Sequence, residues 1–307
     1  LFEDNAEYGF GMMLAEQAER KLLEKYMDDA MDVASPQLQE AFKDWKEHKL
    51  EGEGSRQRSD AIIALLEQEK EGKPALEQVY EMKKFLVKRS QWIFGGDGWA
   101  YDIGYGGLDH VLAQGQDINV LVFDTEVYSN TGGQASKATP TAAVAQFAAS
   151  GKKTKKKDLG MMEAQYGYIY VAQVAMGADK NQFLKALKEA EAYKGPSLII
   201  GYAPCINHGL KVGQGQSQLE EKRAVEAGYW HLWRYNPELK KQGKNPFTLD
   251  SKPPTANFRD FLMGETRFAS LKRTFPDTAE ALFEKTEQDA KERYEGYVRL
   301  TKAYDEK

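Results

Sequence analysis

Two short apolar segments, each ending in small and polar residues, constrain the fold of this chain more than any other feature. Trp92-Ile93-Phe94 stops at Gly95-Gly96-Asp97-Gly98, and Ile118–Phe123 stops at Asp124-Thr125. The segment between them, from about Ile103 to Ala113, is rich in small residues and is expected to be a helix. Strands that are apolar along their whole length are typical of a parallel sheet covered on both faces.

The segments that follow continue this alternation of strand and helix. Tyr168–Val174 and Ser197–Tyr202 are predicted strands, and Asn181–Tyr193 is the predicted helix between them. Trp230–Arg234 is expected to be an outer strand, and the proline-rich stretch Asn245–Pro254 an exposed connection. The predicted fold class is therefore α/β, with a mostly parallel sheet and helices on both faces.

The two ends of the chain are predicted to be helical. In the first ninety residues, apolar side chains recur at intervals of three and four positions. We predict one domain over residues 1–307, with a helical lead-in (1–90), an α/β core (91–235) and a C-terminal helical arm (236–307). The chain begins at Leu1, with neither a start methionine nor a targeting signal, which predicts that it is a piece of a longer chain.

Composition narrows the functional classes. A net charge of −5 argues against a general nucleic-acid binder, and the longest apolar runs are far too short to cross a membrane. The single cysteine, Cys205, cannot form an intramolecular disulfide, which fits a reducing cytoplasm. None of the four histidines are spaced as a zinc pair.

The two strand ends carry matching chemistry. Ligands of an open parallel sheet collect outside the carboxyl ends of its strands, and the glycines beside Asp97 let backbone N–H groups approach an anion. Asp97 lies 28 positions before Thr125, the interval of a strand end, a helix and the next strand end. A Mg²⁺-bridged diphosphate could take the Asp97 carboxylate, the Thr125 hydroxyl and the Val127 carbonyl as ligands. Taken alone, Asp97 between two glycines is more readily explained as a turn former, and only the second motif at the right interval favours the metal.

The motifs around these residues resemble a known family. A Gly-Asp-Gly followed after some 26 residues by asparagine is the thiamine-diphosphate signature, and Thr125 here takes the place of the asparagine. That departure, with GDGWAYDIGYGGLDHVL at 96–112 and DTEVYSNTGGQASKATP at 124–140, resembles the pyruvate:ferredoxin (flavodoxin) oxidoreductases, in their C-terminal thiamine-diphosphate-binding domain. The resemblance covers essentially the whole chain, and the two long motifs are highly specific.

The resemblance implies a set of functional residues. Asp97, Thr125 and the Val127 carbonyl would bind Mg²⁺, and the Asn130 amide would face the 2-oxoacid substrate as the catalytic residue. Cys205 falls where the family has the last thiolate of a 4Fe–4S cluster, whose other three ligands lie outside this chain. The residues that line the diphosphate would be Gly96, Asp97, Gly98, Trp99, Thr125, Glu126, Val127, Tyr128, Ser129 and Asn130.

The resemblance also implies an activity for the complete enzyme. Pyruvate would be oxidatively decarboxylated to carbon dioxide and acetyl-CoA, with coenzyme A as acyl acceptor and electrons passing to ferredoxin or flavodoxin in anaerobic metabolism. The partners would be the remaining domains of the same enzyme, in a cytoplasmic homodimer, with no nucleic acid and no membrane. Two alternatives stay open: the parent enzyme uses another 2-oxoacid, or the isolated chain is an inactive cofactor-binding or assembly module.

Simpler interpretations apply to several of these residues. A lone cysteine such as Cys205 is more often a buried small hydrophobe than a ligand. His110 and His208 have no partner visible in the sequence and are expected to be structural. The lysine-rich run 151–157 is expected to be a solvated loop, with a site for an acidic redox partner or coenzyme A as the weaker alternative.

Overall fold

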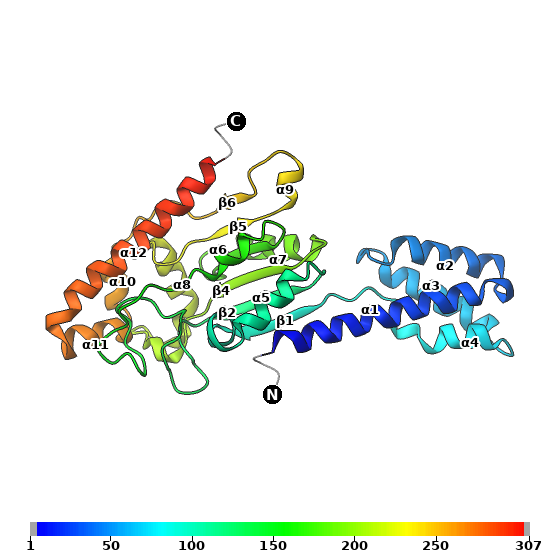
Figure 1. The fold of residues 1–307 in the computed structure, drawn as a ribbon, viewed down its shortest axis with the longest axis horizontal. Coiled ribbons are helices and arrows are strands. Elements are labelled where there is room, and N and C mark those ends of the chain that lie inside the picture. The colour runs from blue at the N-terminus through cyan, green and yellow to red at the C-terminus, as the bar shows by residue number, and fades with distance from the viewer. Residues whose placement is uncertain (1–4, 304–307) are drawn as a thin grey trace. The chain divides into compact units, whose positions relative to one another are not determined.

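A computed structural model describes residues 5–303 of the chain (Figure 1). Leu1, from which a longer chain is predicted, lies outside the described residues. The chain divides into two compact units, one of residues 8–91 and one of residues 1–7 with 92–307. The division falls at the predicted boundary between lead-in and core, and the assignment of residues 1–307 to one domain stays a prediction.

Residues 8–91 form a small helical unit, as predicted for the lead-in. Its core is formed by side chains such as Leu38, Phe42 and Trp45, all of which are buried. The Trp45 Nε1 donates a hydrogen bond to the carbonyl of Leu86 at 2.7 Å, which ties the end of the unit to its second helix. The helices are α1 (Ala6–Asp29), α2 (Pro36–His48), α3 (Ser55–Glu69) and α4 (Pro74–Glu81).

The larger unit is built on a six-stranded sheet in the order β1-β2-β4-β3-β5-β6. The four strands predicted from their apolar runs pair in parallel, and the last two are antiparallel, which confirms a mostly parallel sheet. The strands are β1 (Trp92–Gly96), β2 (Asn119–Asp124), β3 (Tyr170–Val174), β4 (Ser197–Tyr202), β5 (Trp233–Tyr235) and β6 (Phe247–Leu249).

The end of the sheet differs from the prediction. The predicted outer strand is shorter and later than expected, and β5 does not form the edge. The edge is β6, which lies inside the proline-rich stretch that was predicted to be an exposed connection. The prediction of a connection at 245–254 is therefore wrong, because Trp233 of β5 pairs with Leu249 and draws this short segment into the sheet.

Helices cover both faces of the sheet. Ile199 of β4 lies in the core cluster that contains Ala186 of helix α7 (Lys180–Ala192). A Cβ on Gly160, in helix α6 (Leu159–Ala164), would contact Ile200, the next residue of β4. Because successive side chains of a strand point to opposite faces, α6 and α7 lie on opposite sides of the sheet.

The C-terminal segment packs on the antiparallel strands. Tyr297 of the long last helix is buried, and its ring lies 5.7 Å from that of Trp233 and 5.9 Å from that of Phe247. This helix runs along the sheet in Figure 1. The remaining helices are α5 (Tyr105–Ala113), α8 (Ser217–Glu226), α9 (Glu238–Lys241), α10 (Phe258–Met263), α11 (Thr266–Thr274) and α12 (Pro276–Lys302).

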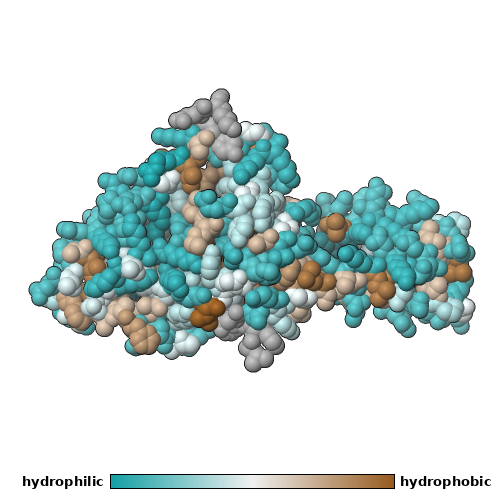
Figure 2. Space-filling model, in the orientation of Figure 1, coloured by the Kyte–Doolittle hydropathy of each residue, from teal (hydrophilic) through white to brown (hydrophobic). Residues whose placement is uncertain are grey.

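The surface is mainly hydrophilic on the face drawn in Figure 2, where hydrophobic residues are scattered. Within residues 5–303, no helix combines the length and the apolar character needed to cross a membrane.

Candidate cofactor site

The first two strands end side by side and bring the two predicted motifs together. Strands β1 and β2 are parallel neighbours, with Gly96 opposite Phe123. The residues that follow these strand ends are therefore adjacent. The Asp97 Oδ1 accepts hydrogen bonds from the Thr125 backbone N–H at 3.1 Å and from the Thr125 hydroxyl at 2.7 Å.

Three oxygens converge at this point. The Thr125 Oγ1 lies 2.7 Å from the Asp97 Oδ1 and 3.0 Å from the Val127 carbonyl oxygen. Adjacent ligands of an octahedral Mg²⁺ lie about 3.0 Å apart, because each is roughly 2.1 Å from the ion. The separations are therefore those of neighbouring ligands of one ion, and the donor set fits Mg²⁺.

The side chains around Asp97 do not by themselves form a complete metal site. Within the described part of the chain, no group of three or more His, Cys, Asp or Glu could hold a metal ion. Mg²⁺ is commonly bound through one or two carboxylates together with substrate phosphates and water. A metal at Asp97 would thus depend on oxygens from a bound diphosphate.

A pocket of about 470 Å³ opens beside these oxygens, and every residue predicted to line the diphosphate borders it, except Glu126. Asn130 is exposed at this pocket, as a substrate-facing residue requires. Apolar walls that the sequence does not predict are formed by Phe94, Ile103 and Phe123.

Close packing explains two of the glycines near the pocket. A Cβ on Gly98 would lie 2.5 Å from the ring of Tyr128, and a Cβ on Gly95 would lie 2.2 Å from the ring of Trp99. Neither glycine has a positive φ, so the requirement is for space. Gly98 begins a π-helical turn, Gly98–Ile103, which precedes α5 and which the sequence does not predict.

Asp97 is buried and has a perturbed pKa. Its side chain is 1% exposed, and its Oδ2 accepts a hydrogen bond from the Ser136 hydroxyl at 2.8 Å. Burial, together with the neighbouring negative charge of Asp124, raises the pKa of Asp97 to about 7. A positive ion at the carboxylate would relieve both effects. Such a perturbed carboxyl at a pocket is typical of a functional site.

Behind the loop that carries Thr125 lies a buried charge cluster, formed by Asp124, Glu126, Lys156, Tyr229, Glu265 and Arg267. Glu126 is predicted to line the diphosphate, but its carboxylate belongs to this cluster and does not border the pocket. Burial raises the pKa of Glu126, but the charges of Lys156 and Arg267 outweigh burial and lower this pKa to about 2.

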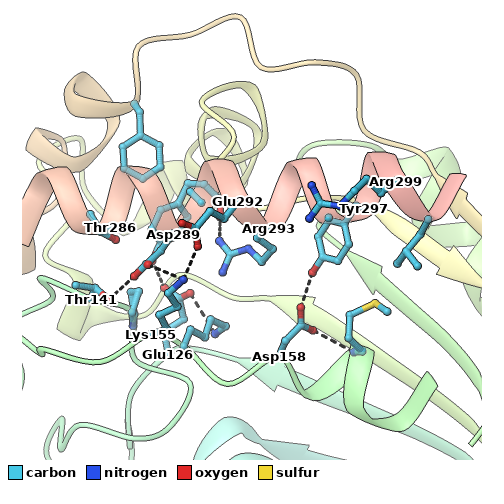
Figure 3. A pocket seen from close by; sticks show the side chains of 18 residues that line it. Glu126, Thr141, Lys155, Asp158, Thr286, Asp289, Glu292, Arg293, Tyr297 and Arg299 are labelled. Atoms are coloured by element: carbon cyan, nitrogen blue, oxygen red, sulfur yellow. Dashed lines mark hydrogen bonds and ion pairs between the residues drawn. The ribbon is translucent and has the colours of Figure 1, made fainter. Parts of the chain in front are cut away.

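The prediction that the lysine-rich run 151–157 is a solvated loop is wrong for Lys156. The Lys156 side chain is 8% exposed and pairs with Asp124 at 2.7 Å and Glu126 at 3.2 Å. Lys155, its neighbour, is largely exposed and pairs with Asp289 and Glu292 of α12. Figure 3 shows this second pair in a cavity of about 600 Å³ that lies beside α12 and is separate from the pocket at Asp97.

Cys205 lies in a turn that is linked to the Thr125 loop. Its Sγ accepts a hydrogen bond from the Asn207 N–H at 3.3 Å. Burial lowers the pKa of His208 to about 3, so the ring is neutral and its Nε2 donates to the Thr125 carbonyl at 2.8 Å. His208 therefore has the structural role predicted for it. This hydrogen bond holds the turn that contains Cys205, the predicted cluster ligand, against the loop that contains Thr125, the predicted metal ligand.

Ser136, Lys156 and Arg267 are absent from the predicted site. Ser136 lies within the 124–140 motif, so its place there was the one available indication of a role. Both residues contact Glu126 from far along the sequence: Lys156 lies 30 positions after it, and Arg267 lies 141 positions after it. No local pattern marks such partners.

Both motifs lie in a region of the chain that is similar to known proteins. Residues 80–200 match the C-terminal TPP-binding domain of thiamine pyrophosphate enzymes, a match that includes both strand ends and stops before Cys205. The pyruvate-flavodoxin oxidoreductase of Klebsiella pneumoniae is 62% identical over 301 residues, covering 98% of this chain and 26% of that protein.

Two further relatives extend the comparison. The pyruvate:ferredoxin oxidoreductase of Moorella thermoacetica is 58% identical over 306 residues, covering 98% of this chain and 26% of that protein. The mitochondrial pyruvate dehydrogenase (NADP+) of Euglena gracilis is 47% identical over 302 residues, covering 98% of this chain and 17% of that protein. The chain thus spans about a quarter, or less, of the length of these relatives. Residues 80–200 are thus similar to the C-terminal thiamine-pyrophosphate-binding domain, and nearly all of the chain is similar to one part of the pyruvate-flavodoxin and pyruvate:ferredoxin oxidoreductases.

Proposed function

We propose that this chain binds Mg²⁺ and the diphosphate of thiamine diphosphate for a pyruvate:ferredoxin (flavodoxin) oxidoreductase. The observation that supports this most directly is the convergence of Asp97 Oδ1, Thr125 Oγ1 and the Val127 carbonyl at 2.7 and 3.0 Å. These oxygens would hold the ion, and the glycines at 96 and 98 would border the diphosphate. When bound, the cofactor's thiazolium supplies the carbon chemistry, and the protein binds and orients it.

The proposed reaction of the complete enzyme is the oxidative decarboxylation of pyruvate to carbon dioxide and acetyl-CoA. The names of these relatives support pyruvate as substrate and flavodoxin or ferredoxin as acceptor. The Euglena relative is named for NADP+, which supports an acceptor that is set outside this chain. Asn130, which is exposed at the pocket, would donate a hydrogen bond from its amide N–H to the 2-oxoacid. The proposed partners are the remaining domains of the same enzyme and a second copy of it, and the proposed location is the cytoplasm.

Cys205 is proposed as one thiolate of a 4Fe–4S cluster. Its turn is tied to the Thr125 loop through His208, which supports a cluster close to the cofactor. A 4Fe–4S cluster needs four ligands, and Cys205 is the one cysteine in the sequence. The isolated chain would therefore hold no cluster, which favours an inactive cofactor-binding module for the chain by itself.

The metal assignment is tested by Thr125→Val in the complete enzyme. Valine keeps the volume of the side chain but lacks the hydroxyl, so the fold should persist although the hydrogen bonds to Asp97 and Val127 and the ligand oxygen are lost. We expect the Mg²⁺ concentration for half-maximal retention of thiamine diphosphate to rise at least roughly 10–100-fold, the range seen when partners of metal ligands are removed. Thr125→Asn, which restores an oxygen ligand, should retain part of the binding.

Thr286→Val is the matched control, since this buried threonine of α12 does not border the pocket at Asp97. Its Mg²⁺ requirement should equal that of the unmodified enzyme. If Thr125→Val also binds Mg²⁺ normally, Thr125 is not a ligand and the proposed metal site is wrong.

A further inference from the structure

Glu126 has an unusual backbone conformation for its residue type. Its φ is +60°, in the left-handed region, and it is one of three non-glycine residues with positive φ in the described part of the chain. A side chain longer than that of asparagine or aspartate has no local hydrogen bond that favours this region, so the conformation costs free energy. Surrounding contacts must hold it in place.

The contacts that hold Glu126 come from both its side chain and its backbone. The carboxylate is 1% exposed and accepts hydrogen bonds from the Tyr229 hydroxyl and, at 2.8 Å, from Arg267 Nη2. The Lys156 ammonium lies 3.2 Å from its other oxygen. The Glu126 N–H donates to Asp124 Oδ1 at 3.1 Å, and its carbonyl accepts from the Thr139 hydroxyl.

The neighbours of Glu126 are the two proposed ligands on this loop. Thr125 and Val127 border the pocket, whereas the Glu126 side chain reaches the buried charge cluster. With Glu126 turned away in the left-handed conformation, the Val127 carbonyl comes within 3.0 Å of the Thr125 hydroxyl. An extended residue at this position would carry the chain onward and separate the two oxygens.

We propose that Glu126 is a positioning residue, whose buried carboxylate holds the loop in the conformation that presents Thr125 Oγ1 and the Val127 carbonyl to one Mg²⁺. This inference rests on the proposed function, because it concerns the same metal site. Glu126 itself does not touch the ion. Its role is to fix the distance between two ligands through contacts made on the far side of the loop.

Glu126→Gly and Glu126→Gln in the complete enzyme separate the possible causes. Glycine adopts a positive φ freely but has no carboxylate, so it keeps the allowed conformation and loses the anchor. Glutamine keeps the shape but not the charge that pairs with Lys156 and Arg267. We expect both variants to raise the Mg²⁺ concentration for half-maximal retention of thiamine diphosphate by roughly 10–100-fold.

Two further variants control for folding. Tyr229→Phe removes one hydrogen bond to the carboxylate and should raise the Mg²⁺ requirement by a smaller factor, even if the Glu126 variants do not fold. Glu189→Gln breaks a partly buried ion pair, with Arg234 at 2.7 Å, on helix α7. It should leave the Mg²⁺ requirement unchanged although it weakens the fold.

The outcomes distinguish this inference from the proposed function. If Thr125→Val raises the Mg²⁺ requirement while the folded Glu126 variants and Tyr229→Phe leave it unchanged, the site stands and the positioning role is overturned. The role is also overturned if Glu189→Gln has an effect as large as Glu126→Gln. If the unmodified enzyme retains thiamine diphosphate after complete removal of Mg²⁺, the proposed metal site itself fails.

Discussion

Gly98→Ala offers a direct test of how tightly the pocket is packed. The added Cβ would lie 2.5 Å from two ring carbons of Tyr128, whereas carbon atoms in contact are roughly 3.5–4.0 Å apart. The ring must therefore move by about 1 Å. Such overpacking costs about 1–3 kcal/mol, and the better helix propensity of alanine offsets up to about 1 kcal/mol. We expect the free energy of unfolding to fall by about 1 kcal/mol.

Gly96→Ala is the matched control, because it lies on the other side of Asp97 and no atom lies within 4 Å of its added Cβ. Glycine inside a strand is less stable than alanine by roughly 0.5–1 kcal/mol, so this variant should be as stable as the unmodified chain or slightly more so. Urea unfolding of the 307-residue chain, followed by circular dichroism, gives the midpoint of each variant. Equal slopes in urea would show that the midpoints report stability.

A double-mutant cycle with Tyr128→Ala identifies the cause. Without the ring, Gly98→Ala should cost nothing, and the coupling free energy between positions 98 and 128 should be about 1 kcal/mol or more. If Gly98→Ala costs as much in the Tyr128→Ala background as in the unmodified chain, contact with the ring is not the reason. Destabilisation by Gly96→Ala of the same size would equally contradict the packing explanation.

Two further predictions concern residues outside the pocket. Glu163 is fully buried, and burial together with Asp109 raises its pKa to about 7, so the folded chain loses stability relative to the unfolded chain as pH rises from about 4 to 7. Glu163→Gln should therefore be more stable than the unmodified chain by about 3 kcal/mol at pH 8 and equal to it at pH 4, as measured by urea unfolding; an equal difference at both pH values would contradict this. In the complete enzyme, Cys205→Ala should remove or alter one 4Fe–4S signal in electron paramagnetic resonance, and an unchanged spectrum would leave Cys205 as a packing residue.

The parallel strands and the main pair of site residues could be predicted because the information for them is local. An apolar run followed by glycine and aspartate marks a strand end, and neighbouring parallel strands end at the same edge. The proximity of Asp97 and Thr125 follows from these rules, whereas their role as metal ligands stays a prediction. Strand β6 could not be predicted in this way, because its three residues lie among prolines and become a strand only through pairing with β5.

The buried charge cluster could not be predicted because its members are distinguished only by the fold. Lys155 and Lys156 are adjacent and identical in type, and both lie in a run of lysines. The Lys155 side chain is 56% exposed, whereas that of Lys156 is 8% exposed and faces two carboxylates. Composition predicts a solvated loop for both, and for Lys156 the long-range contact with Asp124 decides otherwise.

The segment from Asp124 to Val127 therefore has two faces with different roles. Thr125 and Val127 direct oxygens to the pocket, while the alternate residues, Asp124 and Glu126, are buried in the charge cluster. Asp124 accepts from the Tyr101 hydroxyl at 2.7 Å and pairs with Lys156, so its carboxylate holds the strand end in the same way that Glu126 holds the loop. Because these residues hold the ligands in place, the motif is expected to include more residues than the metal ligands themselves. The residues between the ligands must satisfy the buried cluster, since without that support the ligand oxygens would not share one geometry.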